Sequence, residues 1–135
     1  MVGLPPNELE REIGRTRHAL ARETDGPIAL FRPPLEQHDA TVDGWLRDHA
    51  MTEVLWSIDT QDSMGASARH IFAEVRDHLS PGDIILMHEN RGTTQNALPR
   101  ILDLIVSKGY RTVTIPQLLA LDPPSRVQLR THTCS

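Results

Sequence analysis

The chain has 135 residues, of which 39% are hydrophobic and 24% charged, and this balance predicts one globular domain rather than a disordered or fibrous chain. The formal net charge of −4 argues against a general nucleic-acid binder, and the single cysteine, Cys134, excludes an intramolecular disulfide. Apolar runs such as 84–87 are far shorter than a membrane span of about 20 residues, and the segment MVGLPPNELERE lacks the apolar core of a secretory signal.

Helical and strand-like segments alternate along the chain. Apolar residues at helical spacing predict helices over 8–23, 40–49, 66–79, 94–108 and 116–121. Short apolar or β-branched runs predict strands over 28–31, 53–58, 84–87 and 111–115. This order predicts an α/β fold with a parallel sheet covered by helices, either an open doubly wound sheet or part of a (β/α) barrel. We expect residues 122–135 to form a loose tail.

Polar side chains follow three of the predicted strands. Arg32 comes directly after the first strand, Asp62 comes shortly after the second, and His88 comes directly after the third. Because the carboxyl ends of adjacent parallel strands meet at one rim of a sheet, we expect these three side chains to converge.

Such a set suits acid catalysis. A carboxylate beside a histidine holds the imidazole in one orientation and favours its protonated form, and an arginine beside the carboxylate keeps it ionised. Together Arg32, Asp62 and His88 can protonate a leaving group during hydrolysis. The alternative is that Arg32 and Asp62 form a structural ion pair and that His88 only ends a strand.

The other histidines do not indicate a metal site. His70 and His78 are eight residues apart on one predicted helix, which is too far for them to share a metal ion. His18, His38 and His49 are scattered, without the H-x-x-x-H spacing of metal ligands. We therefore predict no metal ligand in this chain.

Four segments together resemble a known family. They are FRPP (31–34), WSIDTQDS (56–63), ILMHEN (85–90) and TTQNALPRILDLIVSKGYRTVTIPQLL (93–119). Their order and spacing resemble those of the polysaccharide deacetylases, which are also called the NodB-homology group or carbohydrate esterase family 4. The resemblance covers residues 4–121. The resemblance implies the C-terminal portion of a deformed (β/α)7 barrel. It also implies removal of N- or O-acetyl groups from a glycan, with a divalent metal, usually zinc, that polarises the acetyl carbonyl and activates water.

The resemblance also implies roles for individual residues. Arg32 matches the arginine that braces the catalytic machinery, Asp62 matches the aspartate that pairs with that arginine and orients the histidine, and His88 matches the general acid. We assign substrate binding to Leu86, Pro34 and Trp56, although a tryptophan at such a position more often belongs to the core.

The matched segments also differ from the family pattern. Leu35 and Glu36 stand where an aromatic residue and a glycine are usual, and Ser63 stands where a tryptophan is usual. These changes remove aromatic walls of the acetyl pocket. Glu89 replaces an aspartate, which is a milder change.

Two family motifs do not occur in this sequence. They are the Thr-Phe-Asp-Asp-like strand end, which supplies the base and a metal ligand, and the H-x-x-x-H pair of ligands. We therefore expect zinc in the complete family domain and not in this chain by itself. Three hypotheses follow: a deacetylase acting on an acetylated polysaccharide, an inactive deacetylase-derived module that binds a glycan or a protein, and an unrelated open α/β sheet. A homodimer that covers exposed sheet edges is a further expectation.

Overall fold

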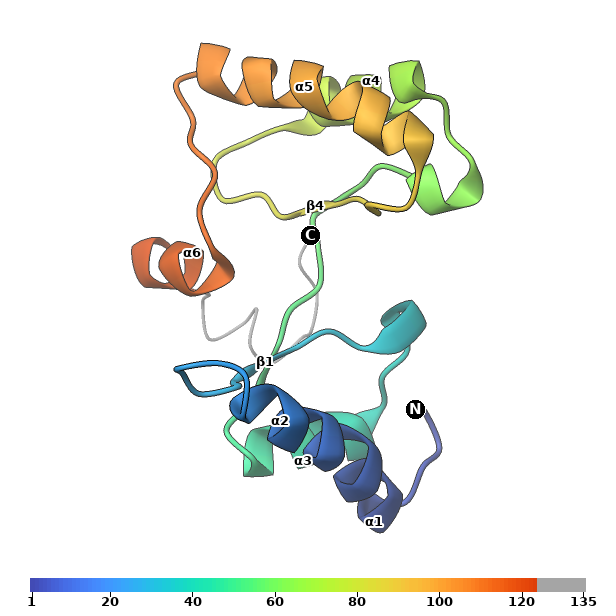
Figure 1. Ribbon diagram of the computed structural model, residues 1–135, viewed down its shortest axis with the longest axis vertical. Coiled ribbons are helices and arrows are strands. Elements are labelled where there is room, and N and C mark those ends of the chain that lie inside the picture. The colour runs from blue at the N-terminus through green and yellow to red at the C-terminus, as the bar shows by residue number, and fades with distance from the viewer. Residues whose placement is uncertain (124–135) are drawn as a thin grey trace. The chain divides into compact units, whose positions relative to one another are not determined.

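The computed structural model describes residues 1–123, and the chain divides into two compact units, Met1–Leu55 and Trp56–Ser135 (Figure 1). Each unit holds helices, a pair of short parallel strands and a hydrophobic core of its own. The two cores share no residue.

The first unit begins with an unbroken helical segment that confirms the helix predicted over 8–23. It consists of α1 (Pro6–Leu9), a π-helical stretch (Glu10–Gly14) and α2 (Arg15–Ala21). Next come β1 (Leu30–Phe31), a 3-10 turn (Pro34–Glu36), α3 (Ala40–Asp48) and β2 (Thr52–Glu53).

Helix α3 starts where the Asp39 side chain accepts hydrogen bonds from the backbone amides of Thr41 and Val42. Its apolar face packs against α1, and β1 pairs with β2 in parallel, with Leu30 opposite Thr52. The core of this unit consists of Leu9, Ile13, Val42, Trp45, Leu46 and Met51.

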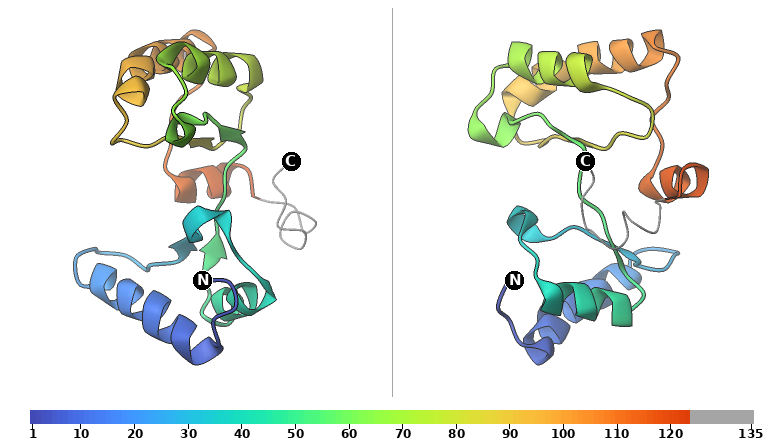
Figure 2. Two further views of the ribbon diagram at one scale, coloured as in Figure 1. Left: turned by 90° about the vertical axis from the view of Figure 1, so that its right-hand side faces the viewer. Right: turned by 180° about the vertical axis from the view of Figure 1, so that it is seen from behind.

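The second unit carries the other parallel pair. It contains β3 (Ile58–Asp59), a 3-10 turn (Asp62–Met64), α4 (Ala68–His78), β4 (Ile85–Leu86), α5 (Gly92–Ser107) and α6 (Ile115–Leu121). Helices α4 and α5 lie side by side over these strands (Figures 1 and 2). Between the helices and β3 lie the buried residues Ile58, Ile71, Val75, Leu79, Ala97, Ile101 and Ile105. Burial of one such isoleucine contributes about 1.5–3 kcal/mol to folding.

Helix α5 ends as the sequence predicts. Gly109 has a φ of 74°, a left-handed conformation that residues with a Cβ rarely adopt. Its amide donates to the Val106 carbonyl, and the Tyr110 amide donates to the Ile105 carbonyl, which satisfies carbonyl groups of the last helical turn.

Two strand predictions were wrong. The run 53–58 is not one strand, because its first residue pairs with β1 and its last pairs with β4, so 54–57 connects two separate ladders. The run 111–115 forms no strand. Thr114 instead caps α6: its hydroxyl accepts from the Gln117 amide, and the Gln117 side chain accepts from the Thr114 amide.

The predicted alternation of helices and strands is confirmed, and the strands pair in parallel as predicted, in two sheets of two strands each. The barrel arrangement and the single domain boundary at 4–121 stay predictions. The tail predicted from residue 122 lies, from residue 124 onward, outside the described residues. Within residues 1–123, no helix is both long enough and apolar enough to cross a bilayer.

Candidate functional site

The carboxylate of Asp62 and the imidazole of His88 form a close pair in the second unit. The distance from His88 Nδ1 to Asp62 Oδ1 is 2.8 Å, and the His88 backbone amide donates to Asp62 Oδ2 at 2.6 Å. The Thr94 hydroxyl donates to the same Oδ2 at 2.6 Å. The meeting of Asp62 and His88 was predicted from the sequence, whereas the contact of Thr94 was not.

The register of the two strands places this pair. Ile58 lies opposite Ile85 and Asp59 lies opposite Leu86, so both strands end at the same rim of the sheet. The buried Thr60 hydroxyl donates to the Leu86 carbonyl at 2.8 Å, which ties the segment after β3 to the end of β4. Asp62 and His88 therefore follow their strands at one rim, as expected for parallel neighbours.

The pair combines a buried carboxylate with a partly exposed imidazole. Asp62 is fully buried, whereas 40% of the His88 side chain is exposed. Burial raises the pKa of Asp62, but hydrogen bonds from the Thr94 hydroxyl, the His88 imidazole and the His88 amide outweigh burial and bring that pKa to about 2. Asp62 is thus ionised at neutral pH and can hold a proton on His88 Nδ1.

Arg32 follows β1 in the first unit. Its Nε donates to the Val54 carbonyl at 3.0 Å, and a terminal nitrogen donates to the Leu55 carbonyl at 3.2 Å. Arg32 therefore also ties the end of β1 to the segment after β2, a role that the sequence analysis did not foresee. Its pairing with Asp62 stays a prediction.

The three residues assigned to substrate binding occupy different settings. Leu86 is the half-buried last residue of β4, and Pro34 is exposed at the start of the 3-10 turn after β1. Trp56 is half-buried between β2 and β3. Their substrate contacts stay predictions.

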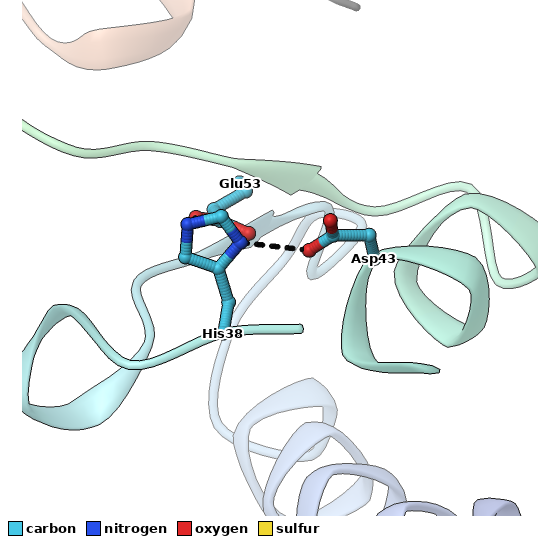
Figure 3. A group of neighbouring side chains, drawn as sticks. All are labelled: His38, Asp43 and Glu53. Carbon is cyan, nitrogen blue, oxygen red and sulfur yellow. Dashed lines mark hydrogen bonds and ion pairs between the residues drawn. The ribbon is translucent and has the colours of Figure 1, made fainter. Parts of the chain in front are cut away.

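A second polar group lies in the first unit. The distance from His38 Nδ1 to Asp43 Oδ1 is 2.9 Å, and the distance from His38 Nε2 to Glu53 Oε1 is 3.6 Å (Figure 3). The three residues come from the loop before α3, from α3 itself and from β2. This group was not predicted from the sequence, because no regular spacing links residues of these three elements.

Within the described residues, the His38 group is the one cluster of three side chains able to hold a metal ion. The hydrogen bond to Asp43 requires a proton on Nδ1, so the imidazole would bind an ion through Nε2. The group combines one histidine with two carboxylates, whereas the resemblance implies one aspartate and two histidines, so the group does not match the metal ligands of the family. The carboxylates, acting first through the Asp43 hydrogen bond, raise the pKa of His38, although burial opposes them.

The chain is similar in sequence to bacterial deacetylases. A peptidoglycan-N-acetylglucosamine deacetylase of Bacillus cereus is 34% identical over 117 residues, which are 83% of this chain and 54% of that protein. No family model matches the chain.

The chain is also similar in structure to solved proteins of carbohydrate esterase family 4. A family 4 carbohydrate esterase from Streptomyces lividans, in complex with acetate, aligns with a TM-score of 0.77 and 36% identity over 84% of this chain and 59% of that one. A family 4 pseudoenzyme from Bacillus anthracis aligns with a TM-score of 0.80 and 25% identity, over 88% of this chain and 42% of that one.

The fold is therefore that of a carbohydrate-deacetylase-like α/β protein. The relatives are polysaccharide and peptidoglycan deacetylases of carbohydrate esterase family 4, which confirms the resemblance read from the four sequence segments. The chain spans about half the length of these three relatives.

Proposed function

We propose that this chain is the acid-bearing portion of a metal-dependent glycan deacetylase, with His88 as the general acid and Asp62 as the group that orients it. The observation that carries the proposal is the bond from His88 Nδ1 to a fully buried, ionised Asp62 in a chain similar to deacetylases. The substrate is an acetylated polysaccharide such as peptidoglycan, the substrate for which the B. cereus relative is named.

The geometry suits proton donation at one defined atom. Because Nδ1 is turned toward a buried carboxylate, the exposed part of the ring presents Nε2 to a bound substrate. Nε2 can then give its proton to the amine or hydroxyl leaving group, while Asp62 stabilises the imidazolium that precedes the transfer. Arg32 would brace Asp62, and Leu86, Pro34 and Trp56 would line the acetyl pocket.

The metal belongs to the complete family domain. When bound there, a divalent ion supplies polarisation of the acetyl carbonyl and activation of water. Its ligands would come from the two family motifs that this sequence lacks, so that the deacetylase reaction requires residues additional to those of this chain. The single partial domain over 4–121 and its half-barrel arrangement belong to the same proposal.

A chimera tests this function directly. Residues 4–121 would replace the matching stretch of the S. lividans esterase, and acetate release from N-acetylated chitooligosaccharides and acetylated xylan would be measured with added Zn²⁺. We expect release by the chimera, and a loss of about 100-fold or more with His88→Ala, because a general acid contributes about 10²–10⁴-fold. The parent esterase is the positive control, and thermal melting reports whether each chimera folds.

A second candidate is an inactive module that binds a glycan. The similarity to the B. anthracis pseudoenzyme favours it. A folded chimera that binds the oligosaccharide in calorimetry without releasing acetate would support this module and contradict the catalytic role of His88.

A further inference from the structure

Three hydrogen-bond donors meet the Asp62 carboxylate, and all of them come from the second unit. His88 Nδ1 approaches Oδ1, whereas the His88 amide and the Thr94 hydroxyl both approach Oδ2. Thr94 is 5% exposed and lies in the first turn of α5, so the contact joins the start of that helix to the segment after β3. None of the family segments assigns a role to this threonine.

Thr94 does not act as a local helix cap. Arg91 occupies the N-cap position of α5, and the Thr94 hydroxyl donates to a carboxylate 32 residues earlier in the chain. A carboxylate accepts hydrogen bonds only and offers about four lone-pair positions, so an added donor favours its ionised form. A hydroxyl-to-carboxylate bond of this kind is charge-assisted and short.

The two donors on Oδ2 fix the plane of the carboxylate. The His88 amide belongs to the same residue as the imidazole and can move with it, whereas Thr94 is held by a 16-residue helix that packs on α4. Thr94 therefore supplies an anchor that is independent of His88. With Oδ2 anchored, Oδ1 remains turned toward His88 Nδ1.

We propose that Thr94 is a positioning residue for the acid: by anchoring Asp62 Oδ2, it keeps Oδ1 on His88 Nδ1 and leaves Nε2 as the atom that exchanges the proton. The proposal rests on the proposed function of His88 as the general acid. It adds a further member to the site, which acts through Asp62 rather than on the substrate.

The test measures Asp62 and His88 directly in the 135-residue chain, labelled with ¹³C and ¹⁵N. In Thr94→Val, which keeps the shape and removes the hydroxyl, we expect the titration midpoint of the Asp62 carboxyl carbon to rise by about one pH unit. We also expect the His88 ring nitrogens at pH 8 to show more of the tautomer with the proton on Nε2. Thr94→Ser restores the hydroxyl and should restore both signals.

Thr60→Val is the matched control. Thr60 is also a buried threonine beside the site, but its hydroxyl donates to the Leu86 carbonyl and not to Asp62. We expect it to lower the melting temperature as Thr94→Val does while leaving the Asp62 midpoint and the His88 tautomer unchanged. Equal shifts of the Asp62 midpoint in the two valine variants, or an unchanged Asp62 midpoint in Thr94→Val, would overturn the proposal.

These measurements separate two failures. The midpoint and tautomer need no metal, substrate or turnover, so they decide the role of Thr94 even where the chimera releases no acetate. Acetate release that survives His88→Ala would refute the proposed acid while leaving the Thr94 contact as measured.

Discussion

His88 contacts Asp62 with both its side chain and its main chain. The imidazole Nδ1 lies 2.8 Å from Oδ1 and the backbone amide 2.6 Å from Oδ2. The main-chain bond fixes the segment after β4, and the side-chain bond fixes the ring on that segment. Each bond restricts the geometry available to the other, so the pair holds one ring orientation.

Asp62→Asn should reduce stability most near neutral pH. The folded pKa of Asp62, about 2, lies below the ordinary value of 3.8, so its contribution is present above pH 4 and is lost as the pH falls through 2. The difference between these two pKa values corresponds to about 2 kcal/mol in the free energy of unfolding. Urea unfolding between pH 2 and 7 measures it.

The control for this variant is Asp77→Asn. Asp77 pairs with Arg76 at the surface, where 53% of its side chain is exposed, and solvent screens such a pair. We expect it to change stability little at any of these pH values. If Asp62→Asn were as mild as Asp77→Asn at pH 7, the ionised Asp62 would not stabilise the fold.

Arg32 and Asp62 should be energetically coupled if they pair. A double-mutant cycle with Arg32→Ala and Asp62→Asn, measured by urea unfolding, is expected to give a coupling of about 1 kcal/mol or more. The part of the Arg32→Ala effect that comes from losing bonds to the Val54 and Leu55 carbonyls cancels in the cycle. Additive effects would contradict the pairing of Arg32 with Asp62.

The His38 group should make stability depend on pH in the opposite sense. Its raised folded pKa means that protonated His38 contributes stability below pH 6.5, and this contribution is lost as the pH rises through the folded pKa. The free energy of unfolding should therefore fall between pH 6 and 9. His38→Gln should flatten this dependence, whereas His78→Gln, whose side chain is 62% exposed, should preserve it.

Zinc should not stay with the chain. After incubation with Zn²⁺ and desalting, metal analysis is expected to give far less than one zinc per chain, because the His38 group has one histidine where the family site has two and its Nδ1 already bonds Asp43. One retained zinc per chain, lost in His38→Gln, would prove that this group is a metal site.

The longer elements were predictable and the short ones were not. Helix α5 has apolar residues at regular spacing over four turns, so its periodicity is unmistakable in the sequence. The strands pair over only two residues each. Whether 54–57 or 111–114 forms a strand depends on which other segment of the chain lies beside it. Thr114 shows the conflict, since a β-branched residue that suits a strand is used as a helix cap.

The meeting of Asp62 and His88 could be predicted from chain order, because each follows a strand and adjacent parallel strands end at one edge. The groups that surround this pair depend on how the helices and strands pack. The Thr94 hydroxyl reaches Asp62 only because α5 packs beside the strands, and the His38 group assembles from three elements with no shared spacing. Hydrogen bonds act over about 3 Å, a distance that chain order alone does not specify.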